Sequence, residues 1–221
     1  MSRSTCIVAA VPPTAKPDRY HHGNLRPALL DAATQLVEER GIDGLTLREV
    51  ARRAGVSHNA PYHHFQDKAA LVQALAEDGY EQLLAAELEA VDEAATIPGR
   101  IRALGHAYVR FALESPERFT LMNRPELRRE DEVTPVQRAG MASEAPLLDA
   151  ITAGQEAGSL ADGDPGLLGL AAWATVHGLA MLLVDGPLRD LVPRDESLGP
   201  LIDGVLDTIL LGLQGRPTLP P

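Results

Sequence analysis

The side chains best suited to chemistry lie close together between Thr46 and Lys68, where hydroxyl, imidazole, amide and ammonium groups follow one another. Such groups contact nucleic acid, because they bond to phosphate oxygens and to base edges in the grooves. The predicted DNA-contacting set is Thr46, Arg48, Ser57, His58, Asn59, Ala60, Tyr62, His63, His64 and Lys68.

Two roles are predicted within this set. Asn pairs well with adenine in the major groove, so Asn59, together with His58 and His63, is expected to reach base edges. Three other side chains are better placed for phosphates: Tyr62, His64 and Lys68.

Two short helices joined by a tight turn must position these side chains, which is the helix-turn-helix plan. The first helix is predicted at Leu47–Ala54, with Thr46 and Glu49 forming a capping box at its start. Gly55 ends it, because glycine adopts a positive φ at no steric cost. Ser57 is expected to cap a recognition helix over His58–Phe65.

Pro61 disturbs that recognition helix. It lies four residues after Ser57 and lacks the N–H that would bond to the Ser57 carbonyl. We therefore predict a tight, 3₁₀-like start and a short row of contacts.

Helical patterns surround this motif. A helix is predicted at Leu25–Arg40, capped by Asn24, and a long helix follows Asp67 to about Val91. Further helices are expected from near Pro98, from Ser115 to Asn123, over 133–157 with a bend or restart at Pro146, over 165–184 after Asp164, and over 198–213. Arg124–Glu132 is expected to be a charged loop.

These patterns predict an all-α fold, because no stretch alternates with period two for long enough to form a strand. An N-terminal three-helix helix-turn-helix domain is followed by a larger helical domain. The predicted divisions are 1–19, a disordered arm; 20–68, the DNA-binding domain; 69–215, the regulatory domain; and 216–221, a tail.

The charge distribution supports a DNA-facing end. The net charge is −11, but residues 1–70 carry 9 Lys/Arg and 7 Asp/Glu, whereas the remainder carries 11 and 24. Such asymmetry favours one DNA-facing end on an acidic body.

A cytoplasmic location is predicted, because there is one Cys and no secretory signal. Pro165–Val184 has no formal charge and is long enough to span a bilayer. Its Gly and polar residues, with acidic residues at both ends, favour a subunit interface or a buried core instead.

The segment from Gly44 to Ser57, followed by Tyr62-His63-His64-Phe65, Lys68 and Leu71, closely resembles the DNA-binding domain of the tetracycline-repressor (TetR) family. The resemblance covers about residues 20–75, and Pro61 departs from the commonest form of the motif. The run Trp173 to Gly178 resembles the Trp-His-Gly signature of one class of TetR regulatory domains. The resemblance implies a homodimer formed through about 164–184 and 198–213, and a ligand cavity in each body.

Candidate ligand contacts in the body are aromatic, imidazole and thioether side chains: Tyr108, Phe111, Met122, Trp173, His177 and Met181. Trp173 and His177 are four residues apart and share a helix face. The alternative is that these side chains form a packed core. No cofactor or metal is predicted, because the adjacent His pairs point apart and lack further ligands. Catalytic motifs are also missing from the sequence, so it does not predict an enzyme.

The sequence therefore predicts a ligand-responsive repressor that binds a palindromic operator in double-stranded DNA as a homodimer. Two alternatives stay open: a DNA-binding protein without a small-molecule effector, and a helical ligand-binding protein that has lost DNA binding.

Overall fold

A computed structural model describes residues 25–127, 132–190 and 198–214, and these contain helices and no strands. The all-α prediction is confirmed. The helices are α1 (Leu25–Arg40), η1 (Ile42–Gly44), α2 (Leu47–Arg53), η2 (Ala60–His63), α3 (Lys68–Asp92), α4 (Ile97–Glu114), α5 (Pro116–Met122), η3 (Pro125–Leu127), α6 (Pro135–Glu156), α7 (Pro165–Val184) and α8 (Leu198–Leu213), where η marks a 3₁₀ helix.

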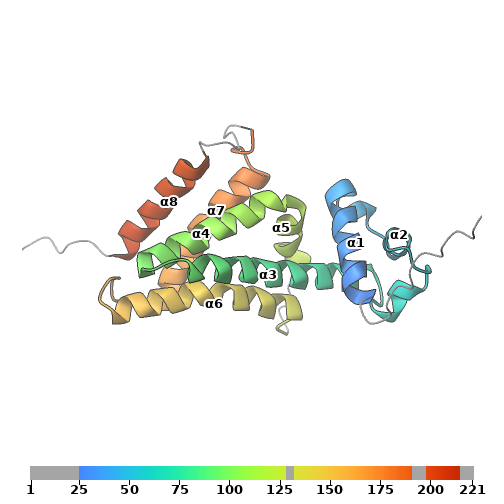
Figure 1. Ribbon diagram of the computed structural model, residues 1–221, viewed down its shortest axis with the longest axis horizontal. Helices are drawn as coiled ribbons and strands as arrows, with labels where there is room; N and C mark the ends of the chain where they lie inside the picture. The colour runs from blue at the N-terminus through green and yellow to red at the C-terminus, as the bar shows by residue number, and fades with distance from the viewer. Residues whose placement is uncertain (1–24, 128–131, 191–197, 215–221) are drawn as a thin grey trace, which may run out of the picture.

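The long helix α3 joins two parts of the molecule (Figure 1). Helices α1 and α2 gather at its N-terminal end, and the rest of α3 runs into the body between α4 and α6. Helices α7 and α8 complete the body, and α5 lies where the body meets α1. The part that carries the predicted DNA contacts is therefore connected to the body by one continuous helix.

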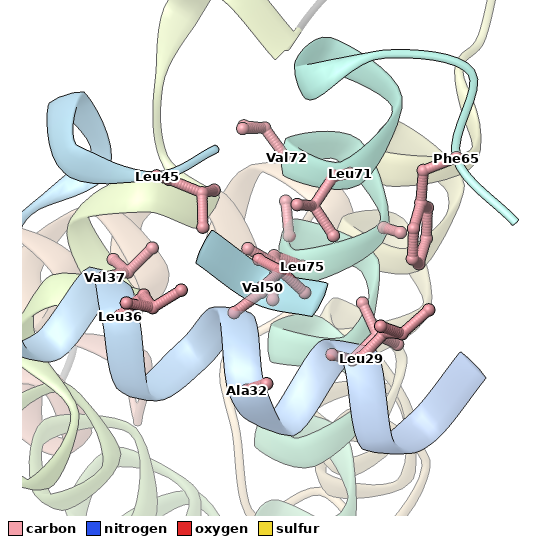
Figure 2. Packing of buried hydrophobic residues seen from close by; sticks show 14 of the residues in the cluster. Leu29, Ala32, Leu36, Val37, Leu45, Val50, Phe65, Leu71, Val72 and Leu75 are labelled. Atoms are coloured by element: carbon pink, nitrogen blue, oxygen red, sulfur yellow. The ribbon is translucent and has the colours of Figure 1, made fainter. Parts of the chain in front are cut away.

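The N-terminal part packs around the apolar face of α1, as its periodicity predicts. Leu29 and Leu36 are fully buried against Val50 of α2, Phe65 and Leu71 (Figure 2). Burying each such side chain contributes about 1.5–3 kcal/mol. This core fixes the angle between α1 and α2 and the place where α3 begins.

Caps define where the long helices begin. The Asp67 carboxylate accepts a hydrogen bond from Ala70 N–H at 2.8 Å, which confirms the predicted start of α3. Asp164 caps α7 in a similar way through Gly166 N–H. Helix boundaries at these sites follow from side chains that satisfy otherwise unpaired N–H groups.

Helix α6 differs from its prediction. It begins at Pro135 rather than at position 133, and it continues to Glu156 past Pro146 instead of restarting there. A capping box between Thr134 and Gln137 sets the start. Packing against α3, α4 and α7 holds this helix together across the proline.

Several predictions fall outside the described residues: the arm at 1–19, the Asn24 cap, the tail at 216–221 and residues 128–131 of the charged loop. The described start of that loop is the short 3₁₀ helix η3.

Candidate functional site

Helix α2 begins at the predicted cap. The Thr46 hydroxyl accepts a hydrogen bond from Glu49 N–H at 3.2 Å, and Thr46 and Arg48 are exposed. The reciprocal half of the predicted capping box does not form, because the Glu49 carboxylate accepts from the Arg52 guanidinium at 2.7 and 3.0 Å. The polar start of α2 thus faces solvent, while its apolar side is buried.

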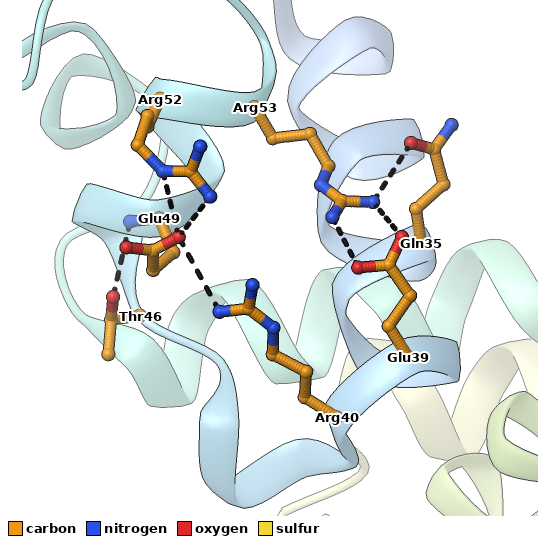
Figure 3. A network of polar contacts seen from close by, with 7 residues as sticks. All are labelled: Gln35, Glu39, Arg40, Thr46, Glu49, Arg52 and Arg53. Atoms are coloured by element: carbon orange, nitrogen blue, oxygen red, sulfur yellow. Dashed lines mark hydrogen bonds and ion pairs between the residues drawn. The ribbon is translucent and has the colours of Figure 1, made fainter.

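A second ion pair, between Arg53 of α2 and Glu39 of α1, joins these two helices (Figure 3). Both terminal nitrogens of Arg53 donate to the two carboxylate oxygens of Glu39, and one also donates to Gln35. The Arg53 guanidinium lowers the pKa of Glu39, and the Arg52 guanidinium does the same for Glu49. A bidentate pair of this kind fixes orientation as well as distance. Arg53 therefore holds α2 against α1, whereas Arg52 pairs within α2.

The turn after α2 has the predicted glycine geometry. Gly55 has φ +69°, and Val56 N–H donates to the Ala51 carbonyl at 3.0 Å. Helix α2 ends at Arg53, with Ala54 as its C-cap, one residue earlier than predicted. A left-handed residue at this position turns the chain back toward the start of the next segment.

The reading segment, residues 57–65, is not the predicted α-helix over His58–Phe65. Only Ala60–His63 is helical, and the helix is of the 3₁₀ type. The Ser57 carbonyl accepts from Ala60 N–H at 3.0 Å, because Pro61 has no N–H to offer. Asn59, not Ser57, precedes the helix, and neither supplies a side-chain cap. The predicted 3₁₀ character is confirmed and extends through the whole helix.

Within the reading segment, the buried residues anchor the segment to the core, and the exposed residues are predicted DNA contacts. Pro61 and Phe65 are buried and hold the segment to the core. Ala60 is partly buried. Six of the predicted DNA contacts are exposed: Ser57, His58, Asn59, Tyr62, His63 and His64.

Two cations border the reading segment. The Lys68 ammonium, predicted to contact phosphate, donates to the carbonyl of Ile42, the first residue of η1, at 2.7 Å. An ammonium has three donors, so this bond leaves others for a second acceptor. The Arg26 guanidinium lies 5.7 Å from the centre of the Phe65 ring. Arg26 was not among the residues predicted to border the reading segment, although its place as a cation in the first turn of α1 was a signal in the sequence.

Four rings form an aromatic cluster in the body: Tyr108, Phe119, Trp173 and His177. The Tyr108 hydroxyl and His177 Nδ1 are hydrogen-bonded at 2.8 Å. The His177 ring stacks on Trp173 with centroids 4.9 Å apart, as their spacing predicts, and Phe119 meets Tyr108 edge-on at 5.6 Å. The cluster ties α4, α5 and α7 together.

Three cavities adjoin this cluster, and two of them share Tyr108, Ser143, Glu144 and Trp173. The outer cavity has a volume of about 300 Å³ and is bordered by Met122 as well. The inner cavity is smaller, about 40 Å³, and residues from α3, α4, α6, α7 and α8 line it.

Three predicted ligand contacts therefore border a cavity: Tyr108, Met122 and Trp173. Of the other three, Phe111 is buried and Met181 is packed against the core. His177 lines neither cavity, but it contacts Tyr108 and Trp173, which line both.

Glu87 of α3 was missed by the sequence reasoning. It lines the inner cavity with only 6% of its surface exposed, and its Oε2 accepts no hydrogen bond from the described residues. Burial raises its pKa to about 8 and also raises the pKa of Glu144. The signal was present: Glu87 lies four residues after Leu83 and four before Val91, on the apolar face of α3.

Comparison with known protein families identifies the family of this chain. Residues 29–75 match the family described as "Bacterial regulatory proteins, tetR family", and residues 101–205 match "Tetracyclin repressor-like, C-terminal domain". The chain belongs to the TetR family. It is therefore a DNA-binding transcriptional regulator, as the sequence predicts.

Individual TetR-family relatives are similar over different lengths. The class A tetracycline repressor of Escherichia coli is 51% identical over 49 residues, which are 22% of this chain and 23% of that repressor. The transcriptional repressor AcnR of Corynebacterium glutamicum is 31% identical over 57% of this chain and 61% of its own length. A solved protein of unknown function from Rhodococcus sp. RHA1 is 40% identical, with a TM-score of 0.78, and the match covers 91% of this chain and all of that one.

The body of this TetR-family protein leaves apolar side chains uncovered on its last two helices. Leu167 and Leu170 of α7 are 63% and 57% exposed, and Leu211 of α8 is 69% exposed. Among the described helices, α7 has the length and composition to cross a membrane, a test that core and interface helices of soluble proteins also pass.

Proposed function

We propose that this TetR-family regulator is a ligand-responsive repressor that binds a palindromic operator as a homodimer in the cytoplasm. The observation that carries the proposal is the course of α3. This helix begins at Lys68, three residues after the reading segment, and runs into the body (Figure 1). Its residue Glu87 lines the inner cavity. One helix thus connects the predicted DNA contacts with the cavity.

Direct DNA contacts are assigned to the exposed polar groups of the helix-turn-helix. We assign His58, Asn59 and His63 of the reading segment to base edges, and Tyr62 and the neighbouring Lys68 to phosphates; all five side chains are exposed. In a two-fold dimer, the two segments would enter major grooves about 34–36 Å apart. The operator would then be a palindrome with half-sites one helical turn apart, or a multiple of it.

Dimerisation is assigned to α7 and α8. Their exposed leucines form the kind of apolar surface that monomeric proteins rarely expose and that oligomeric proteins bury in an interface. A second copy related by two-fold symmetry would cover the same patch on both subunits at once. The small residues Gly178 and Gly204, which have open space beside them, would let the helices approach closely.

The effector signal would pass through α3 and α5. Helix α3 has 25 residues and is about 37 Å long, so a small tilt at the cavity moves its DNA-side end by several ångström. On α5, Phe119 packs in the aromatic cluster, while the neighbouring Arg118 donates to Thr34 of α1 at 3.3 Å. A ligand that favours one position of these helices changes operator affinity only by its differential affinity for the two states.

Selection of bound DNA from a random pool tests the DNA assignment. We expect a palindrome to be enriched, and Tyr62→Ala and Lys68→Ala to weaken its binding at fixed salt. Lys68→Ala should also lower the slope of log affinity against log salt by about one for each subunit. Arg110→Ala, an exposed cation on α4, is the matched control and should change neither quantity. No enriched palindrome, or equal effects of Arg110→Ala and Lys68→Ala, would contradict the assignment.

Light scattering after gel filtration tests the dimer. The substitutions Leu170→Glu and Leu211→Glu should convert the dimer to a monomer, because they place charge in the proposed interface. Leu88→Glu is the control, since Leu88 of α3 is also half-exposed but lies outside that surface. A monomeric wild-type chain would refute the dimer, and so would a dimer that survives both interface substitutions.

A further inference from the structure

Glu87 is an acid in an unusual place. Its side chain is more than nine-tenths buried, it lines a mostly apolar cavity, and its Oε2 has no hydrogen-bond partner among the described residues. Leaving a buried polar group without a hydrogen bond destabilises the folded state. A ligand that supplies the hydrogen bond to Oε2 would explain why an acid is buried at this position.

The surroundings of Glu87 have one sign of charge. Glu144 of α6, a second half-buried carboxyl, lines the inner cavity with Glu87 and also lines the outer cavity. Neither Lys nor Arg lines either cavity within the part of the chain that the structure describes. Burial raises the pKa of Glu87 to about 8, so at neutral pH an incoming ammonium group would displace a proton from this carboxyl group. Ionised carboxyl groups without basic neighbours attract cations and repel anions.

Aromatic walls favour the same class of ligand. Trp173 and Tyr108 border both cavities, and the faces of such rings attract ammonium groups. The outer cavity, at about 300 Å³, leaves space for an apolar body.

We propose that the effector is an organic cation: an ammonium group bound by Glu87 and Glu144, carried on an apolar chain or ring that occupies the outer cavity. The ammonium N–H groups would supply the hydrogen bond that Glu87 Oε2 lacks. The regulatory consequence rests on the proposed function, because binding affects transcription only if the protein releases an operator. The binding itself does not depend on DNA.

Trp173 makes the proposal directly measurable. It is the only tryptophan in the chain and borders both cavities, so its fluorescence reports on their occupancy. The probes are octylammonium, 1-octanol and octanoate, which share a chain length and differ in head-group charge. Octylammonium should bind at least about tenfold more tightly than either of the others, a difference of about 1.4 kcal/mol.

Substitutions assign that preference to the acids. Glu87→Gln keeps the shape of the side chain and should weaken octylammonium binding about tenfold, while 1-octanol binding stays within about threefold. Glu144→Gln should have a smaller effect in the same direction, because Glu144 is only half-buried. Glu89→Gln is the control, since Glu89 is exposed on the same helix. Circular dichroism of each variant confirms that it is folded.

Two results would overturn the proposal: 1-octanol or octanoate binding as tightly as octylammonium, or octylammonium binding unchanged in Glu87→Gln. Operator release is measured separately with the DNA selected above. Cation binding that leaves operator affinity unchanged would refute the effector role. Failure to select any operator would instead contradict the DNA assignment, and the fluorescence titration would still decide the ligand class.

Discussion

Replacing Glu87 by Gln should change how the stability of the protein depends on pH. Burial raises the pKa of Glu87 from its usual 4.5 to about 8, so the folded state retains a proton that the unfolded chain has lost. Between these two pH values, the wild-type protein loses unfolding free energy as the pH rises. Its Glu87-dependent stability is fully present below about pH 4.5 and is lost as the pH passes about 8.

The magnitude follows from the same pKa. Within this window, the loss approaches about 1.4 kcal/mol for each pH unit. From about pH 5.5 to pH 7.5, the unfolding free energy of wild type should fall by roughly 2.5 kcal/mol relative to Glu87→Gln. Glutamine has no proton to lose, so the variant lacks this part of the pH dependence and should be the more stable protein at the higher pH.

Urea unfolding at both pH values checks the prediction, followed by circular dichroism and by Trp173 fluorescence. Protein concentration must be constant, since a dimer gains stability by mass action. Glu89→Gln, exposed on the same helix, should follow the wild-type pH dependence. A difference between wild type and Glu87→Gln that changes by less than about 0.5 kcal/mol over this range would refute the description of Glu87 as a buried, unpartnered acid.

Substitutions at three further positions test the turn after α2, the cap of α3 and the proposed route of the effector signal. Gly55→Ala should destabilise the protein by about 1–2 kcal/mol in thermal unfolding, because φ is +69° there, and Gly55→Asn should cost less; equal stability of all three proteins would contradict the strain argument. Asp67→Ala should cost about 1 kcal/mol by removing the bond to Ala70 N–H, whereas Asp67→Asn should keep most of it; a loss as large in the Asn variant would argue against capping. Arg118→Ala should leave octylammonium affinity within about twofold but reduce the effect of the ligand on operator binding, because the bond to Thr34 is lost. Unchanged coupling in Arg118→Ala would remove α5 from the proposed route.

Local chemistry predicted much of the fold. The first and last described helices begin and end where their periodicity places them, and the caps Thr46, Asp67 and Asp164 act as their side chains predict. These features depend on residues within one or two turns of one another. A single sequence contains that information in full.

The differences from prediction concern competition between alternative hydrogen-bond partners. Glu49 was expected to reach back to Thr46, but Arg52 binds it instead. The bond from Lys68 to the Ile42 carbonyl, which tertiary folding brings near, was not predicted, and the phosphate contact of Lys68 stays a prediction. Glu87 was overlooked because its burial depends on five helices converging around one cavity. Periodicity can place an acid on an apolar face, but it does not show that the space beside the acid is open.

The division of labour within the reading segment has an evolutionary consequence. Buried Pro61 and Phe65 fix its shape, whereas His58, Asn59 and His63 are exposed and are not part of the core. Exposed substitutions away from structural features usually change stability by less than about 0.5 kcal/mol. If these exposed residues make the proposed base contacts, exchanges among them would change the operator sequence while leaving the stability of the fold nearly unchanged, so that gene targets would diverge faster than architecture.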